Sequence, residues 1–268
     1  MGNTEHLPSL PKITIKIRKA VRDKATTWFQ LANLIREDPG LSAQLLKYSS
    51  SPIFRTTTGT PKTVQEIISR MGMSVVDNLI MTHSIKSMFV IKHPVLLKEF
   101  KLIWKRQILK AGISSFLAHQ LKYHSPDEAV LASLLTEVGS LAILMAFENL
   151  EIVPDTEMYV LLCREYSKRL AAVLLAKWSI DEHFVKIVKM NGEWEYKTEG
   201  HASLIDIINL STYHTATWNS RPENLPPLSA LWSYQKLFPP LNEISDTGSL
   251  KIIADHKSAI NEIVNSLG

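Results

Sequence analysis

Two residues that could do chemistry, Thr136 and Glu137, stand side by side in the apolar stretch SLLTEVGSL at residues 133–141. A carboxylate in such a setting can help to hold a divalent metal ion, which activates water for hydrolysis. Without a metal ion, a buried carboxylate needs another partner, because an uncompensated buried charge is costly. The stretch therefore marks either a working site or a place where an earlier chemistry has been lost.

Other recognisable catalytic patterns do not occur in the sequence. It contains no GxxxxGK[ST], GxGxxG, HExxH or GxSxG motif. The nine histidines form no pair with metal-site spacing, and His83, His119, His183 and His214 are interpreted as residues of helix faces or helix ends. Cys163 is the only cysteine, which excludes an internal disulfide and a cysteine-rich zinc site.

The composition is that of an ordinary globular protein. The 268 residues are 45% hydrophobic and 21% charged, so they can bury a sizeable core. The net charge of +4 is too small to indicate a nucleic-acid-binding protein by itself. No uninterrupted run of about 18 apolar residues occurs, so we expect no membrane span. The lone cysteine and the lack of a secretory signal favour the cytoplasm.

The elements that must position Thr136 and Glu137 are predicted to be helices. Strand-like alternation is scarce, and apolar residues recur at helical spacing from Ile13 onward. Thr63 and Glu66 have the spacing of a helix start, and Gly72 is expected to end that helix. Asp155 is placed to cap a helix that runs to about Trp178. Loops are expected at 55–62, 190–201 and 219–227.

The opening stretch is predicted to lie within one helix that begins at Ser125-Pro126 and continues past Met145. Its apolar residues fall at i, i+3, i+4 and i+7, and Ser133, Thr136, Glu137 and Ser140 share the opposite side. Since the second half is apolar on nearly every side, the helix should be buried, with its polar strip facing an internal cleft.

Several segments resemble the HDOD family, the HD-related output domain of bacterial signalling proteins. They are LPSLPKITIKIRKAVRD (7–23), LANLIREDPGLSAQLLKYSSSPIF (31–54), VQEIISRMGMSVVDNLIM (64–81), AVLASLLTEVGSLAIL (129–144) and LAAVLLAKWSID (170–181). The resemblance extends over about residues 7–215. It implies an all-α fold of two helical lobes, similar to that of HD-type metal-dependent phosphohydrolases, which bind metal through histidines and aspartates.

The positions that match the metal ligands of those enzymes are changed in this chain. The His-Asp pair falls on Thr136 and Glu137, the earlier His on Arg106, the later Asp on Thr212, and a further His on Ser167. Only Glu137 keeps a metal-binding group, and arginine offers no lone pair to a metal ion. The resemblance therefore implies a vestigial metal site without a bound cofactor, and a protein that is not an enzyme.

Arg106 and Glu137 should lie close together if these matches are correct. We therefore predict that they form a salt bridge that fills the former metal site, with side chains no more than about 5 Å apart. The alternative is that Arg106 points to solvent beside Lys105, while Glu137 bonds to neighbouring hydroxyl groups or to water.

The function expected on these grounds is that of a non-catalytic regulatory module that binds protein partners. One alternative is a degenerate phosphohydrolase with residual nucleotide or metal binding, in which Glu137, His119 and His214 would converge. A second is a nucleic-acid-binding regulator that uses two groups of basic residues. These groups are Lys16, Arg18, Lys19, Arg22 and Lys24, and then Lys98, Lys101, Lys105, Arg106 and Lys110.

The expected organisation has three parts. Residues 1–92 form an N-terminal helical lobe, residues 93–218 an HD-like helical lobe, and residues 219–268 a C-terminal helical extension that either caps the core or reaches a second subunit. A cleft between the two lobes is the default place for a partner or ligand.

Overall fold

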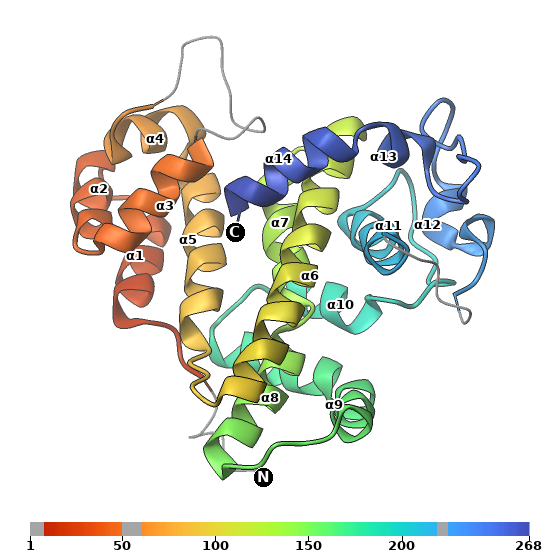
Figure 1. Ribbon diagram of the computed structural model, residues 1–268. Coiled ribbons are helices and arrows are strands. Elements are labelled where there is room, and N and C mark those ends of the chain that lie inside the picture. The colour runs from red at the N-terminus through yellow and green to blue at the C-terminus, as the bar shows by residue number, and fades with distance from the viewer. Residues whose placement is uncertain (1–7, 50–60, 219–224, 268) are drawn as a thin grey trace.

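The computed structural model describes residues 8–49, 61–218 and 225–267, and these residues form an all-α protein (Figure 1). Apart from an isolated bridge between Ile244 and Leu250, the described ranges contain helices, turns and irregular segments. The prediction of an all-α fold is confirmed. Most of the loop expected at 55–62 and part of the one at 219–227 lie outside the described residues, and the boundaries expected at 92 and 218 stay predictions.

Five helices form the described portion of the N-terminal part of the chain. They are α1 (Lys12–Arg22), α2 (Trp28–Arg36), α3 (Pro39–Ser49), α4 (Val64–Met71) and α5 (Met73–Met88). Helices α1 to α4 pack together on one side of the molecule, and α5 stands between them and the rest, where it also contacts α7 (Figure 1). Their apolar faces meet in a core in which Ile17, Leu31, Leu45 and Ile67 are fully buried.

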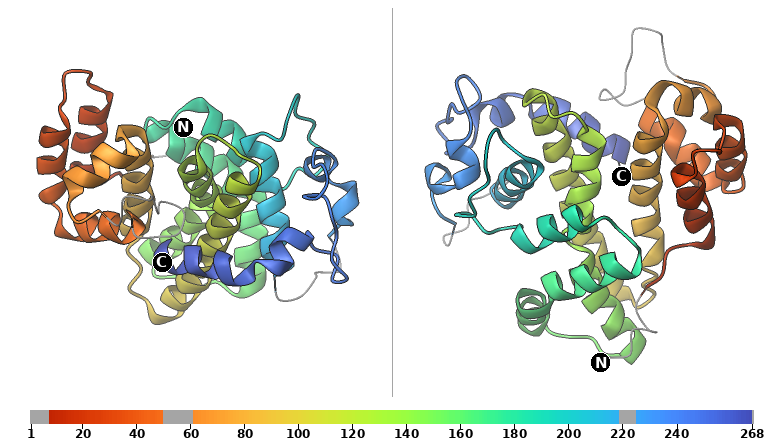
Figure 2. Two further views of the ribbon diagram at one scale, coloured as in Figure 1. Left: turned by 90° about the horizontal axis from the view of Figure 1, so that it is seen from above. Right: turned by 180° about the vertical axis from the view of Figure 1, so that it is seen from behind.

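Residues 94–218 supply six helices, and residues 225–267 supply three more with one short 3-10 helix. They are α6 (Pro94–Gln120), α7 (Pro126–Leu135), α8 (Val138–Leu150), α9 (Thr156–Lys177), α10 (Glu182–Met190), α11 (Leu204–Ala216), η3 (Leu228–Ala230), α12 (Trp232–Gln235), α13 (Lys251–Asp255) and α14 (Lys257–Leu267). Helix α6 runs through the centre and packs against α7, α11 and α14 (Figures 1 and 2).

Local sequence signals set several of these boundaries as expected. The side chain of Thr63 accepts a hydrogen bond from the Glu66 amide at 3.1 Å and starts α4. Gly72, with a φ of 82°, separates α4 from α5 in a backbone conformation that favours glycine. The Asp155 side chain accepts from the Met158 amide at 2.7 Å, and α9 ends before Trp178.

The single helix predicted from Ser125 past Met145 is wrong, because the chain breaks at Thr136 and Glu137 into α7 and α8. The Thr136 hydroxyl donates to the Ser133 carbonyl at 2.6 Å, and the Glu137 amide donates to the Leu134 carbonyl, three residues back. Side-chain bonds of this kind compete with the regular i to i−4 pattern. The break turns Glu137 toward α6 instead of leaving it on the side of a continuous helix.

The segment from α7 to α8, residues 126–150, is long enough and apolar enough to cross a membrane when only its length and composition are considered. A count of uninterrupted apolar residues misses it, because Ser133, Thr136 and Glu137 interrupt the run. Of its most apolar window, 83% is buried inside the protein, which is the behaviour of a core segment.

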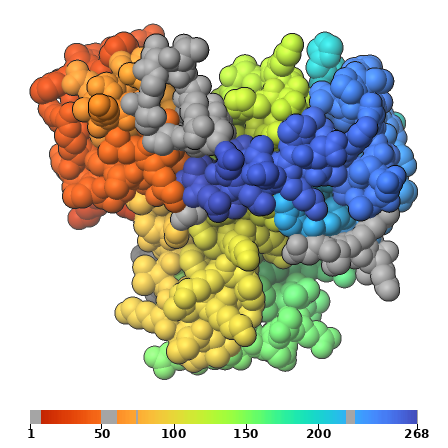
Figure 3. Space-filling model, turned by 45° about the horizontal axis from the view of Figure 1, so that its top comes forward, coloured from red at the N-terminus to blue at the C-terminus, as the bar shows by residue number. Residues whose placement is uncertain are grey.

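Two glycines allow helices to approach closely around α6 and α8. A Cβ atom at Gly139 of α8 would lie 1.9 Å from the backbone oxygen of Ser167 in α9. A Cβ atom at Gly112 of α6 would lie 2.5 Å from Cγ2 of Val264 in α14. The C-terminal helix therefore packs directly on the central one, and it continues to α3 at the edge of the N-terminal helices (Figure 3). The described part of the C-terminal extension thus caps the core.

Candidate functional site

A polar cavity of about 390 Å³ lies where α6, the turn between α7 and α8, and α11 come together. Its lining residues are Arg106, Gln107 and Lys110 from α6, Glu137 from the turn, and Thr212, Thr215 and Ala216 from α11. The helical break at Glu137 and the four-residue spacing of Arg106 and Lys110 place these three charged groups on the same wall. Of the polar strip that was expected to face a cleft, which comprises Ser133, Thr136, Glu137 and Ser140, only Glu137 lines this cavity.

The predicted contact between Arg106 and Glu137 is confirmed. A guanidinium nitrogen of Arg106 lies 3.7 Å from Oε2 of Glu137. The Arg106 side chain is 59% exposed, however, whereas that of Glu137 is 18% exposed. An ion pair with one well-solvated partner contributes little stability, so Arg106 is the weaker of the partners that Glu137 has.

The stronger partner is Lys110, which the matches to HD-type enzymes did not identify. Its side chain is only 3% exposed, and its Nζ lies 3.1 Å from Oε1 of Glu137. The same ammonium group donates a hydrogen bond to Oγ1 of Thr136. One signal for it was available in the sequence: Lys110 follows Arg106 by one helical turn and is flanked by the apolar residues Leu109 and Ala111.

The electrostatics of the site follow from this buried pair. Burial raises the pKa of the Glu137 carboxyl, but the charges of Lys110 and Arg106 and the hydrogen bonds of Lys110 and Ser140 outweigh it, so that the pKa lies below its usual value. Burial lowers the pKa of the Lys110 ammonium, and Glu137 offsets only part of that effect. Each of the two buried charges thus depends on the other for compensation.

The remaining residues matched to metal ligands have separate roles. Thr136 is buried and accepts from Lys110, beside the cavity. Thr212 lines the cavity, and its hydroxyl donates to Oδ1 of Asn191 at 2.6 Å. Ser167 is not among the lining residues, and its backbone in α9 lies directly against Gly139 of α8. Three of the five positions, Arg106, Glu137 and Thr212, therefore line one cavity, and Thr136 contacts the lining residue Lys110.

The cavity wall does not fit a metal ion. It offers one carboxylate, and that carboxylate already contacts an ammonium group at 3.1 Å and a guanidinium group at 3.7 Å. Within the described ranges, no three His, Cys, Asp or Glu side chains lie together in a way that could hold a metal ion. The convergence of Glu137, His119 and His214 that residual metal binding requires is therefore not found. The His119 ring instead contacts the Ser115 carbonyl oxygen.

His214, next to the cavity wall on α11, predicts a sensitivity to acid. The ring is buried, neither nitrogen has a hydrogen-bond partner, and burial lowers its pKa to about 3. Because the unfolded chain takes up this proton near pH 6.5 and the folded chain does not, stability falls as the pH drops through this window. Between pH 7 and pH 5 the loss through His214 should be about 2 kcal/mol.

Urea unfolding at pH 7 and pH 5 measures this contribution. The His214→Phe variant should lose about 2 kcal/mol less than the wild type on acidification, since the titrating group is gone. His201→Phe, at an exposed position, should keep the wild-type dependence. Equal acid sensitivity of the wild type and His214→Phe would show that this ring does not stay neutral in the fold.

This arrangement defines an all-helical protein with a polar cavity where three helices of its central bundle meet. The HDOD domain family model matches residues 7–193, and the chain belongs to the HDOD family. The suspected family is therefore confirmed. No curated protein matches this chain.

Solved structures of low sequence identity share the fold. A candidate metal-dependent phosphohydrolase from Shewanella amazonensis SB2B matches with a TM-score of 0.77 and 18% identity over 98% of this chain and 92% of that one. An HDOD domain protein of unknown function from Geobacter sulfurreducens matches with a TM-score of 0.66 and 19% identity, over 97% of this chain and 92% of that one. A candidate signal transduction protein from Marinobacter aquaeolei VT8 matches with a TM-score of 0.62 and 19% identity, over 97% of this chain and 60% of that one.

Proposed function

We propose that this chain is a non-catalytic regulatory module of bacterial signal transduction, which acts in the cytoplasm by binding protein partners. The observation that carries the proposal is the Lys110 ammonium group, 3.1 Å from Glu137 inside the cavity. If Glu137 matches a metal ligand of HD-type enzymes, as the sequence suggests, this positive side chain contacts the one carboxylate that could have held the ion. Membership of the HDOD family and the fold shared with a candidate signal transduction protein support a regulatory role.

An exposed apolar face supports the binding of a protein partner. It is formed by the end of α8, the loop after it and the first half of α9, and we call it the α8–α9 face. Its members are Leu150, Ile152, Val153, Met158, Val160 and Leu161, which are between 44% and 66% exposed. Large apolar side chains exposed close together in the sequence are candidates for a protein interaction site.

The two alternatives have less support. Phosphohydrolase activity would need metal ligands that the cavity wall does not supply. A nucleic-acid-binding surface would need free basic side chains, yet four of the ten in the two groups contact carboxylates: Lys16 with Glu37, Arg18 with Asp77, and both Arg106 and Lys110 with Glu137. Binding to duplex DNA that weakens steeply with salt would favour the nucleic-acid alternative instead.

Two measurements test the proposal. After incubation with Mn²⁺, Mg²⁺, Ni²⁺ or Zn²⁺ and removal of free ions, we expect the protein to retain less than about 0.1 equivalent of metal, which is the background level. We also expect no chelator-sensitive hydrolysis of nucleotides or phosphodiesters.

Affinity capture from the native cell should recover a protein partner. The Leu161→Glu variant should lose this partner, whereas Lys189→Glu, on α10, should retain it. A stoichiometric metal ion with hydrolysis would contradict the non-catalytic part, and capture unaffected by Leu161→Glu would contradict the α8–α9 face.

A further inference from the structure

A row of exposed residues runs along the first half of α9. Glu157, Val160, Leu161 and Arg164 follow one another at spacings of three and four residues, so they share one side of the helix. All four are exposed, Val160 by 58% and Leu161 by 63%. We call this row the α9 stripe. Its two apolar members belong to the α8–α9 face, and its two charged members lie on either side of them.

The opposite side of the same half of α9 faces the protein. Tyr159, Leu162 and Cys163 pack against the core, and the Tyr159 hydroxyl donates to the Ser140 carbonyl of α8 at 2.9 Å. Helix α9 lies at the outer edge of the molecule, where it packs against α8 and α10 (Figures 1 and 2). The stripe therefore faces away from the core.

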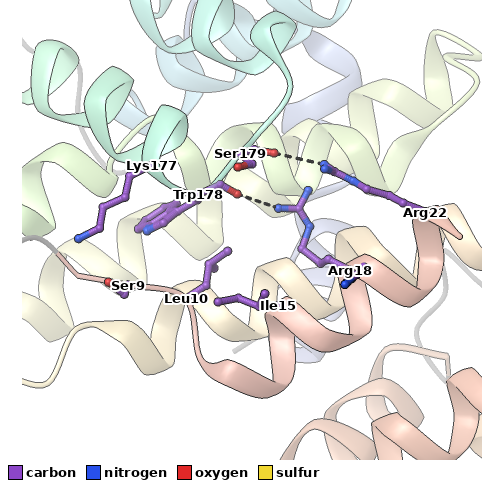
Figure 4. A pocket seen from close by; sticks show the side chains of 9 residues that line it. Ser9, Leu10, Ile15, Arg18, Arg22, Lys177, Trp178 and Ser179 are labelled. Carbon is purple, nitrogen blue, oxygen red and sulfur yellow. Dashed lines mark hydrogen bonds between the residues drawn. The ribbon is translucent and has the colours of Figure 1, made fainter.

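The far end of α9 is anchored as well. Arg18 of α1 donates to the carbonyl of Trp178, and Arg22 donates to the carbonyl of Ser179, each at 3.2 Å (Figure 4). Because contacts fix the helix along its inner side and at its end, it presents the stripe as a preformed surface. Binding to such a surface costs little conformational entropy.

The two charges of the stripe stay uncompensated within the described part of the chain. Neither Glu157 nor Arg164 forms an ion pair there. Their positions differ by seven residues, which places them about 10 Å apart along the helix axis. The stripe thus has a negative end, an apolar centre and a positive end.

This order of groups is complementary to itself when it is reversed. In an antiparallel pair of α9 helices from two copies of the chain, Val160 and Leu161 meet their counterparts at the centre. Glu157 then faces Arg164 of the second copy at both ends of the contact. A parallel pair would instead place like charges opposite each other. Antiparallel pairing of one helix with itself is a two-fold arrangement, and two-fold dimers are the commonest homo-oligomers.

We propose that the α9 stripe binds a second copy of this chain in an antiparallel, two-fold dimer. Val160 and Leu161 form the apolar centre of the contact, and the two pairs of Glu157 with Arg164 lie at its rim, where they fix the orientation. The inference rests on the proposed function, because it names the protein that occupies the α8–α9 face. A module of this kind changes its state with its own concentration.

Sedimentation velocity of the full chain tests the dimer. We expect a monomer–dimer equilibrium in the micromolar range, since one pair of helices forms a small interface. Glu157→Arg and Arg164→Glu each place like charges at both ends of the contact and should weaken the dimer at least about tenfold. Mixing the two variants restores opposite charges at both ends. The heterodimer should therefore form with an affinity within about threefold of the wild type.

The matched control reverses two charges with the same spacing on another helix. Glu182 and Lys189 of α10 are exposed and seven residues apart, and Glu182, like Glu157, lies in the first turn of its helix. Glu182→Arg and Lys189→Glu should each change the dimer affinity by less than about twofold. Far-UV circular dichroism should show the same helix content for all four variants.

Three results would overturn the proposal: a wild-type chain that stays monomeric up to about 100 µM, equal weakening by the α9 and α10 variants, or no heterodimer on mixing. The dimer and the proposed function fail separately. A monomeric chain whose captured partner is lost on Leu161→Glu would contradict the dimer alone. A dimeric chain with a stoichiometric metal ion and hydrolysis would contradict only the non-catalytic role.

Discussion

Lys110→Met should lower the free energy of unfolding by about 3–5 kcal/mol, the loss typical of removing one member of a buried ion pair. The substitution keeps most of the aliphatic side chain, but it leaves Glu137 with only the exposed Arg106 as a charged partner. The Thr136 hydroxyl loses a donor at the same time. Urea unfolding at neutral pH, followed by far-UV circular dichroism, measures the change.

The double variant Lys110→Met/Glu137→Leu separates the lost pair from the lost volume. With both charges gone, the wall becomes apolar, and most of the stability should return to within about 1–2 kcal/mol of the wild type. Lys105→Met makes the same substitution at an exposed position of α6 and should change stability by less than about 0.5 kcal/mol. If Lys110→Met were no less stable than Lys105→Met, the ammonium group would not be the partner on which Glu137 depends.

Gly139→Ala is expected to cost about 3 kcal/mol or more, at the upper end of the range for overpacking. Its new Cβ atom would lie 1.9 Å from the oxygen, 2.6 Å from the carbonyl carbon and 2.9 Å from the Cα atom of Ser167. These are backbone atoms of α9, so no side-chain rotation can relieve the overlap. Helix α9 must move away from α8, which also disturbs the α8–α9 face. Urea unfolding measures the loss, and partner capture should weaken with it.

Gly40→Ala provides the matched control for this substitution. Gly40 also lies in a helix, α3, but its Cβ atom would first meet the side-chain oxygen of Asp38 at 3.3 Å. Stability should therefore stay within about 1 kcal/mol of the wild type, since alanine is the better helix former. A Gly139→Ala variant as stable as Gly40→Ala would show that α8 and α9 are not in such close contact.

Much of the fold could be predicted because its local signals are explicit. Thr63, Gly72 and Asp155 set helix boundaries through hydrogen bonds or backbone conformation that depend on a few neighbouring residues. The break at Thr136 could not be read in this way, because the apolar periodicity continues from α7 into α8 without interruption.

Only part of the candidate site could be predicted from the sequence. Matching single positions to the ligands of HD-type enzymes brought Arg106 and Glu137 together correctly. This matching could not reveal Lys110, because no ligand of those enzymes falls at that position. A lysine in a helix with several other basic residues is first expected to be exposed to solvent. Only the packing of α6 against α7 and α11 shows that this lysine is buried while Lys105 and Arg106 are not.

The position of α14 has a consequence for how the protein is made. This helix lies on Gly112 of α6 and reaches α3, yet it follows both in the chain by more than one hundred residues. During translation, the surface of α6 that receives Val264 stays uncovered until residues 257–267 have left the ribosome. The nascent chain therefore passes through a stage in which this apolar surface is available to chaperones. Helix α14 can pack on α6 and α3 only after these residues have been synthesised.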